Sequence, residues 1–162
     1  MIEIKEATTG DIDIIREIAF KTWPVTYGDI LTKENLDYML GLFYSAEMLR
    51  TNFESGHHFL LAVEDSLSLG FASFYHAQTF TKIPKIYILP QAQGKGIGRM
   101  LIDRIACEAQ ANGSASLMLN VNRNNSARFF YERLGFEIES EEDVRLPSGI
   151  FQEDFVMVKK PE

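Results

Sequence analysis

The sequence predicts an α/β layered domain in which helices flank a mixed, mostly antiparallel sheet of about seven strands. Three observations predict this class. Short apolar runs typical of strands alternate with amphipathic stretches typical of helices, hairpin patterns lie at both ends of the strand-rich part, and one apolar strand leads through glycines into a helix. A β-sandwich or a helical bundle would not produce this order of elements.

The chain has 162 residues, of which 46% are apolar, so it is the size of one ordinary domain with one core. We therefore expect a single domain over residues 1–162. Its parts are an N-terminal strand with helices (1–56), a hairpin followed by a strand and a loop-helix unit (57–113), and a helix with terminal strands (114–162). The formal net charge of -7 disfavours extended contact with phosphates, so we expect no nucleic acid partner.

Cysteine content and hydropathy indicate where the protein works. Cys107 is the single cysteine, which leaves no intramolecular disulfide and no multi-cysteine metal site, and a reducing cytoplasm fits. The N-terminus alternates apolar with charged residues, and the chain has no long uncharged apolar run of the kind that a signal peptide or membrane span needs. We expect a cytoplasmic protein that does not bind membranes, and we assign no metal.

The first third of the chain predicts one strand and three helices. Residues 2–7 alternate in the manner of a half-buried strand. An apolar stripe after Asp11 predicts a helix, which Pro24 is expected to end. Thr32 and Ser45 are expected to be the N-caps of two further helical pieces.

The middle of the chain changes to strand patterns. Residues 59–63 and 70–76 are apolar runs on either side of a turn at 64–69, which predicts a hairpin. A further strand over 83–89 is expected to stop at Pro90, because proline cannot donate to a central ladder.

The last part begins with an amphipathic helix. Ile97, Leu101, Ile105 and Ala109 recur every four residues and predict a helix that ends near 112–113. The remaining expected elements are a short buried strand at 117–119, a helix opened by Asn124 and closed by Gly135, and strands over 136–144 and 151–159.

Three glycines between the strand and the long helix form the first functional motif. Gly94, Gly96 and Gly98 allow the backbone to approach a ligand closely and to take positive φ. A helix start also presents unpaired N–H groups and the positive end of the helix dipole, which together suit a pyrophosphate. On spacing alone, a glycine-rich turn that merely joins strand to helix fits equally well.

Two other phosphate-binding motifs fail on their residues. A P-loop needs a lysine and a hydroxyl residue after its last glycine, whereas Gly98 is followed by Arg99 and Met100. The Rossmann fingerprint needs Gly-x-Gly-x-x-Gly in an N-terminal βαβ unit, and here Arg99 stands where its third glycine would be.

The loop resembles the signature of the GNAT superfamily of acetyltransferases, Gln/Arg-x-x-Gly-x-Gly/Ala, through Gln93, Gly96 and Gly98. Residues 86–90 are similar to that family's strand and its splayed exit. The resemblance implies the GNAT acyl-CoA N-acyltransferase fold and acetyl-CoA as co-substrate. It also implies contacts with coenzyme A from Ile88, Gln93, Gly94, Lys95, Gly96, Ile97, Gly98 and Arg99.

Residues 124–136 resemble the second GNAT motif, Asn-x-x-Ala followed by Phe-Tyr-Glu-x-Leu-Gly-Phe, and imply further coenzyme A contacts from Asn124 and Ser126. The resemblance covers residues 59–159. Helical spacing places Tyr131 on the core side, where a buried phenol needs a hydrogen-bond partner. The resemblance implies that Tyr131 is the general acid that protonates the departing thiolate, and a core tyrosine is the alternative.

The base that would deprotonate an amine is not evident. Many family members carry a glutamate on the strand before the glycines, but residues 81–85 contain no carboxylate. Tyr75 and His76 are candidates for a base or for holding a water that relays the proton. His57 and His58 lack nearby carboxylates and are interpreted as surface residues rather than metal ligands.

The sequence thus predicts an N-acetyltransferase that transfers the acetyl group of acetyl-CoA to a primary amine of a small molecule. Residues 22–27 loosely resemble the polyamine acetyltransferase branch, so a polyamine is one candidate acceptor, with the N-terminal helices as its wall. Asp29, Glu34 and Asp37 either hold a polycation or are ordinary helix-face charges. The alternatives are a protein N-terminal or lysine acetyltransferase and a non-catalytic acyl-CoA-binding module. Family members often form homodimers, with which Phe151 and Phe155 are compatible.

Overall fold

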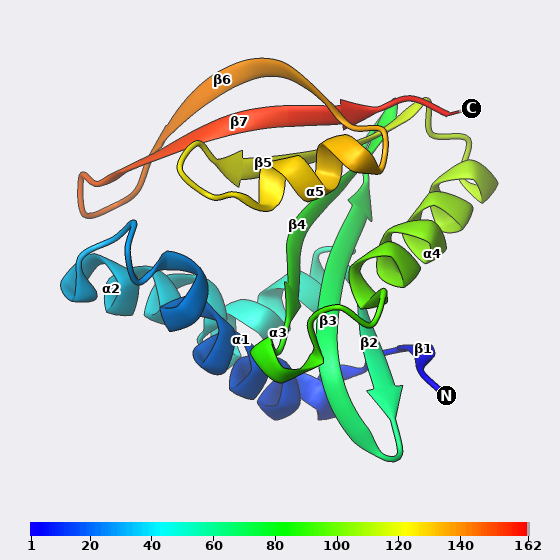
Figure 1. The fold of residues 1–162 in the computed structure, drawn as a ribbon, viewed down its shortest axis with the longest axis horizontal. Coiled ribbons are helices and arrows are strands. Elements are labelled where there is room, and N and C mark those ends of the chain that lie inside the picture. Colours follow the sequence, from blue (N-terminus) through cyan, green and yellow to red (C-terminus); the bar gives the residue numbers. More distant parts are fainter. Residues whose placement is uncertain (162) are drawn as a thin grey trace.

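The computed structural model describes residues 1–161 as one seven-stranded sheet with helices packed around it (Figure 1). The α-helices are α1 (Ile12–Tyr27), α2 (Lys33–Tyr44), α3 (Ala46–Glu54), α4 (Ile97–Ala111) and α5 (Ala127–Arg133). The strands are β1 (Glu3–Glu6), β2 (His58–Glu64), β3 (Leu67–His76), β4 (Phe80–Ile88), β5 (Ser116–Asn122), β6 (Glu137–Arg145) and β7 (Phe151–Lys159). No helix within residues 1–161 is both long and apolar enough to cross a membrane.

The strands lie in the order β1-β2-β3-β4-β5-β7-β6. Every neighbouring pair is antiparallel except β4 and β5, which run parallel. The prediction of a mixed, mostly antiparallel sheet flanked by helices is therefore confirmed.

The parallel pair positions the site, because β4 and β5 are in register for only part of their length. Phe80, Thr81 and Lys82 of β4 pair with residues 116–118 of β5. Beyond these pairs β4 continues to Ile88 without its partner, and Figure 1 shows the two strands diverging. The sheet therefore opens between its two halves.

The helices cover both faces of the sheet. Tyr87 and Ile88 are adjacent on β4, so their side chains point to opposite faces. The Tyr87 ring lies 5.8 Å from the Trp23 ring of α1. A Cβ atom on Gly98, at the start of α4, would lie 3.4 Å from Cδ1 of Ile88. The N-terminal helices therefore pack on one face and α4 packs on the other, as Figure 1 shows.

A bulge in β4 changes which residues face α1. Ser73 of β3 pairs with Lys85 of β4, and Tyr75 of β3 pairs with Lys82 of β4. A step of two residues along β3 therefore corresponds to a step of three residues along β4. The extra residue lies beside Pro84, which cannot donate to the ladder. Since paired residues share a face, Lys82 and Lys85 both lie on the α1 side of the sheet.

The predicted helix signals are confirmed at four positions. The Thr32 hydroxyl accepts a hydrogen bond from the Asn35 amide at 3.1 Å, and the Ser45 hydroxyl accepts from the Met48 amide at 3.0 Å. Gly113 and Gly135 follow α4 and α5 with φ of 77° and 100°, the left-handed region that glycine adopts most readily.

The prediction that Pro24 ends the first helix is wrong, because α1 continues through Pro24 to Tyr27. Pro24 has no amide hydrogen to donate to the Phe20 carbonyl, so one helical hydrogen bond is missing. Pro24 and Phe20 are both exposed, so water is able to bind the unpaired carbonyl. The rings of Trp23 and Tyr27 lie 4.6 Å apart and pack against the sheet, which holds the last turn in place. Tertiary packing therefore overrides the local effect of proline.

The prediction that Asn124 opens the next helix is also wrong, because α5 begins at Ala127. The Asn122 side chain accepts from the Asn124 amide at 2.9 Å, and the Asn125 side chain accepts from the Ala127 amide at 2.9 Å. These two side-chain turns occupy the residues that were expected to be helical.

Some strand boundaries lie outside their predicted limits. The hairpin between β2 and β3 turns at Asp65 and Ser66, with φ of 50° and 67°, so β3 already begins at Leu67. Both residues have the positive φ of a two-residue type I′ turn, which usually carries glycine. β4 begins at Phe80 rather than at residue 83, because Thr81 and Lys82 are polar strand residues that the apolar pattern did not include.

Candidate active site

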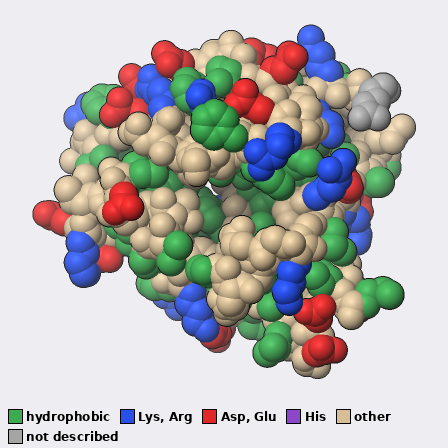
Figure 2. All heavy atoms as spheres, in the orientation of Figure 1, with side chains coloured by type: hydrophobic (Ala, Val, Ile, Leu, Met, Phe, Trp, Pro, Cys, Tyr) green, Lys and Arg blue, Asp and Glu red, His purple; other side chains and the backbone are tan. Residues whose placement is uncertain are grey.

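A cavity of about 720 Å³ lies where β4 and β5 diverge. In the space-filling view the surface is hollowed near the centre of this face (Figure 2). The cavity is lined by segments that are far apart in the sequence, namely the end of α1 (25–27), the second half of β4, the loop and start of α4 (92–98), the middle of β5 (119–121), and the turn and helix that follow it (125–133).

The glycine loop presents bare backbone to this cavity. Gly94 and Gly96 have φ of 83° and 78°, and a Cβ atom added to either would meet no atom within 4 Å. The amide of Met100 donates to the carbonyl of Gly96 at 3.1 Å. Amides nearer the start of α4 have no partner inside the helix and are available to an anion.

Glycine is needed at position 98 for a different physical reason. A Cβ atom at Gly98 would lie 2.8 Å from Cζ of Phe130, closer than side chains are able to pack. Gly98 is therefore required by the close approach of α4 to the ring of Phe130 on α5, and not by a special backbone conformation. This contact joins the two segments that carry the sequence motifs.

Tyr131 lies on α5 with its side chain directed into the core and against the cavity. The residue is 8% exposed and lines the cavity. Its ring packs against Phe130 and Phe136 at centroid distances of 5.4 and 5.8 Å. Burial raises the pKa of the Tyr131 hydroxyl well above its ordinary value, with Tyr27 as a smaller cause. The hydroxyl therefore stays protonated at neutral pH and is able to donate a proton or a hydrogen bond.

Most of the site residues expected from the sequence meet around this cavity. Those that line it are Ile88, Gln93, Gly94, Gly96, Ile97, Gly98, Ser126 and Tyr131. Lys95 extends toward Glu64 of β2, with Nζ 3.2 Å from the carboxylate. Arg99 is exposed at the start of α4, and Asn124 lies in the turn before α5. These last three residues are not part of the lining.

Sequence reasoning missed several lining residues. Asn125 lines the cavity, although the motif had drawn attention to its neighbours. Tyr87 of β4 and Asn120 of β5 also line it. A polar group in the middle of an apolar strand was the available signal for both, because such a group needs a partner when it is buried. Phe129 and Arg133 of α5 are two further lining residues.

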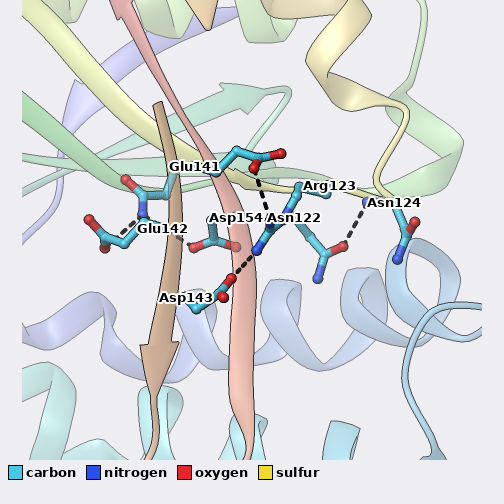
Figure 3. Close-up of polar contacts among 8 residues, drawn as sticks. Asn122, Arg123, Asn124, Glu141, Glu142, Asp143 and Asp154 are labelled. Atoms are coloured by element: carbon cyan, nitrogen blue, oxygen red, sulfur yellow. Dashed lines mark hydrogen bonds and ion pairs between the residues drawn. The ribbon is translucent and has the colours of Figure 1, made fainter. Parts of the chain in front are cut away.

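A polar cluster adjoins the cavity through Asn120. The Asn120 side-chain amide donates to Asp154 Oδ2 of β7 at 3.2 Å and to Glu142 Oε1 of β6 at 3.3 Å. Its carbonyl oxygen accepts from the Lys82 ammonium. Figure 3 shows Asp154 and Glu142 side by side on neighbouring strands. Two carboxylates thus stand next to a residue that lines the cavity.

The surroundings of Asp154 and Lys82 shift the pKa values of their side chains. Burial raises the pKa of the Asp154 carboxyl, while its hydrogen bond to Asn120 opposes the rise. Burial lowers the pKa of the Lys82 ammonium, and the nearby carboxylates of Glu142 and Asp154 oppose that effect. On the other face of these strands, Arg123 pairs with Glu141 and Asp143, as Figure 3 shows.

The candidate bases at the end of β3 lie elsewhere. His76 Nδ1 lies 2.8 Å from the Thr81 hydroxyl, which lies 2.6 Å from the Ser114 hydroxyl after α4. Tyr75 packs against the His57 ring at 4.7 Å. Neither Tyr75 nor His76 lines the cavity, so the geometry gives no support to a direct role for them as base. Within residues 1–161 no group of three or more His, Cys, Asp or Glu side chains is arranged to hold a metal ion.

A family model described as an acetyltransferase (GNAT) domain matches residues 31–148, which is more than half of the chain. The chain belongs to the GNAT acetyltransferase family. The resemblance of the glycine loop and of residues 124–136 to GNAT motifs is thereby confirmed, as is the expectation of an N-acetyltransferase. The family model matches from residue 31, whereas the motif resemblance begins at residue 59, so the matched region also includes α2 and α3.

Comparisons with individual proteins agree with this GNAT assignment. The chain is 28% identical to the spermidine N(1)-acetyltransferase of Thermoplasma acidophilum, over 99% of this chain and 98% of that protein. It is 32% identical to the ribosomal protein bS18 alanine N-acetyltransferase of Haemophilus influenzae, over 63% of this chain and 68% of that protein. The solved structure of the PaiA N-acetyltransferase from Thermoplasma acidophilum, in complex with coenzyme A, matches with a TM-score of 0.84 at 28% identity and 99% coverage of both chains.

Proposed function

We propose that this GNAT protein transfers the acetyl group of acetyl-CoA to a primary amine of a small molecule, and that the acceptor is a polyamine. One observation carries the proposal. The amides of the glycine loop and the hydroxyl-bearing residue Tyr131 line the same cavity, at the point where the sheet opens. A thioester held by its pyrophosphate at the loop therefore lies within the same space as a proton donor.

The cofactor would be held mainly by backbone. The pyrophosphate would accept hydrogen bonds from amides at the start of α4, where Gly94 and Gly96 leave room for it. The exposed edge of β4 near Ile88, together with Gln93, Ile97 and Ser126, would line the pantetheine arm. Lys95, Arg99 and Asn124 remain proposed contacts from the motifs, because coenzyme A would extend past the cavity to residues beside it. The related Thermoplasma structure was solved in complex with coenzyme A, which supports coenzyme A as the group bound here.

In the reaction, the amine nitrogen would attack the thioester carbonyl and the C–S bond would break. The departing thiolate gains a proton, and Tyr131 is the proposed donor because its buried hydroxyl is protonated and faces the cavity. A protein that only binds acyl-CoA would have no need of this hydroxyl. Tyr131 is therefore the residue that separates an enzyme from a binding module.

A polyamine acceptor is supported by the cluster on the α1 side of the sheet. Glu142 and Asp154 stand behind Asn120 and would attract the distant ammonium groups of a polycation. The full-length similarity to a spermidine acetyltransferase points the same way.

The second candidate acceptor is a protein N-terminus, as in the bS18-acetylating relative. The structure favours the small acceptor for a geometric reason. The Tyr38 hydroxyl of α2 accepts a hydrogen bond from the Ser148 amide, in the turn between β6 and β7, at 3.0 Å. Figure 1 shows the turn between β6 and β7 close to α2, so this contact would join elements on either side of the proposed acceptor face and leave less room for a polypeptide.

The proposal is tested by measuring thiol release from acetyl-CoA with spermidine, amino acids, aminoglycosides and an alanine-starting peptide. We expect spermidine to give the highest kcat/KM. Tyr131→Phe should lower kcat by about 10²- to 10⁴-fold with little change in acetyl-CoA affinity. Tyr44→Phe is the matched control, because Tyr44 is buried near the same strands but does not line the cavity. Equal turnover in Tyr131→Phe and the wild type would exclude the acid role.

A further inference from the structure

Two tyrosines from distant parts of the chain meet at the wall of the cavity. Tyr27 ends α1 and Tyr87 lies on β4, and their hydroxyl oxygens are 2.9 Å apart. Both residues line the cavity that Tyr131 also lines. The three phenols therefore line one cavity, with Tyr27 and Tyr87 on the side of the N-terminal helices.

The surroundings of the pair are aromatic. The ring of Trp23 lies 4.6 Å from that of Tyr27 and 5.8 Å from that of Tyr87, and Phe71 packs on Tyr87 at 6.1 Å. Burial raises the pKa of both hydroxyls above that of an ordinary tyrosine, so both remain neutral at physiological pH. When one hydroxyl donates to the other, lone pairs on both oxygens are left to accept hydrogen bonds.

The pair suits an amine for reasons of charge and geometry. An amine nitrogen attacks only when its lone pair is free, and a neutral amine presents N–H groups that need acceptors. Two phenol oxygens supply such acceptors without holding the nitrogen as a cation, as a carboxylate would. An apolar aromatic site also lowers the pKa of a buried amine, because desolvation disfavours the ammonium form.

We propose that Tyr27 and Tyr87 form the acceptor subsite, in which their hydroxyl oxygens bind the reacting amine and direct its lone pair to the acetyl carbonyl. The inference rests on the proposed acetyl transfer and deepens it. Tyr131 would donate a proton to the leaving sulfur, and the hydroxyls of Tyr27 and Tyr87 would bind the attacking nitrogen. Asn120, Glu142 and Asp154 would then contact the distant part of the acceptor rather than the reacting nitrogen.

The chemistry balances without a carboxylate at the nitrogen. The N–C bond forms while the C–S bond breaks, the sulfur takes a proton from Tyr131, the nitrogen passes one proton to water, and Tyr131 takes one proton back from water. A neutral amine and a thioester therefore give an amide and a free thiol with no net uptake or release of protons. Residues 81–85 on β4 need no glutamate in this scheme, because the amine reaches the subsite already neutral.

The experiment measures acceptor binding separately from turnover. Trp23 is the single tryptophan of the chain and lies beside the pair, so its fluorescence reports binding there. Protein saturated with free coenzyme A, which gives no reaction, is titrated with spermidine and then with the other amines of the panel. Tyr27→Phe and Tyr87→Phe should each raise the Kd of the amine by roughly three- to tenfold. The Kd of coenzyme A should stay unchanged.

Tyr44→Phe again serves as control, because its hydroxyl lies in the same aromatic cluster without a hydrogen-bond partner among residues 1–161. Its amine Kd should equal that of the wild type. An unchanged Kd in both phenol variants, an equal rise in Tyr44→Phe, or wild-type protein that binds no amine of the panel would overturn the subsite. If the wild type binds amines through the pair but never releases thiol, the proposed acetyl transfer fails while the subsite stands.

Discussion

Glu141 and Glu142 are neighbours on β6, but their side chains serve opposite faces of the sheet. Glu141 lies 3.5 Å from the Arg123 guanidinium, whereas Glu142 accepts a hydrogen bond from Asn120 at 3.3 Å. The alternation of side chains along a strand explains the difference. Consequently one carboxylate contacts a residue that lines the cavity and the other lies on the opposite face of the sheet, at almost the same position in the chain.

This arrangement gives a charge-matched test of polyamine recognition. Glu142→Gln and Glu141→Gln remove the same charge, but only the first removes it from the acceptor side. Glu142→Gln should raise the KM for spermidine by roughly two- to fivefold, since it weakens one exposed ion pair, and the effect should shrink in high salt. Glu141→Gln should leave this KM unchanged. Equal effects in the two variants would show that net charge, and not the cluster beside Asn120, attracts the acceptor.

A second matched pair tests the phosphate cradle. Gly96 and Gly113 have φ of 78° and 77°, and neither has an atom within 4 Å of an added Cβ. Replacing either by alanine costs about 1–2 kcal/mol of backbone strain. Only Gly96→Ala places a methyl group where the pyrophosphate would approach, so it should weaken coenzyme A binding by roughly tenfold or more in calorimetry. Gly113→Ala should lower stability without changing coenzyme A affinity. If Gly113→Ala weakened coenzyme A binding as much as Gly96→Ala does, backbone strain and not the added methyl group would explain the loss.

Local signals account for much of the fold that the sequence predicted. Thr32, Ser45, Gly113 and Gly135 act within a few residues of themselves, so capping could be inferred without the tertiary structure. The glycine loop was likewise visible because its residues are contiguous. Pro24 is the exception among local signals, since distant packing of its neighbours on the sheet decided the outcome.

Contacts between distant segments could not be inferred from the sequence in the way that the local caps could. Tyr27 and Tyr87 are 60 residues apart, and nothing in either segment specifies the other as a partner. Asn120 meets Asp154 only because β7 lies beside β5 in register. Strand order and register fix these pairs, and hydrophobic pattern alone leaves both undetermined. The residues of the proposed cofactor side were therefore available from contiguous motifs, whereas those of the proposed acceptor side were not.

The close contact between the two motif helices predicts a coupled pair of substitutions. Gly98→Ala would set a methyl group 2.8 Å from Cζ of Phe130 and should destabilise the protein by about 1–3 kcal/mol. Phe130→Leu removes the outer part of the ring, so Gly98→Ala should cost much less in that background. The free energy of unfolding of both single variants and of the double variant, from urea denaturation, measures the coupling. Strict additivity would show that the ring moves aside freely.

Lys85 is a partly buried cation whose desolvation should limit the stability of the protein below pH 8. Burial lowers its pKa from 10.5 to about 8. Its ammonium lies 5.4 Å from the ring centroid of Tyr44 and 3.4 Å from the Asn52 side-chain oxygen. Between these two pKa values the unfolded chain binds the proton and the folded chain does not, so stability rises with pH. Below about pH 8 the ammonium is charged in both states, and the folded state bears the whole desolvation cost.

Lys85→Met should therefore stabilise the protein at pH 7, because methionine keeps the aliphatic packing over Tyr44 and carries no charge. The pKa difference corresponds to a gain of at most about 3 kcal/mol in the free energy of unfolding. The gain should diminish as the pH is raised from 8 toward 10.5, where the wild-type lysine is already neutral in the folded state. Lys33→Met, at an exposed lysine paired with Asp37, is the control and should show no such pH dependence. A Lys85→Met variant that is less stable than the wild type at pH 7 would mean that the contacts with Tyr44 and Asn52 outweigh the desolvation of the ammonium.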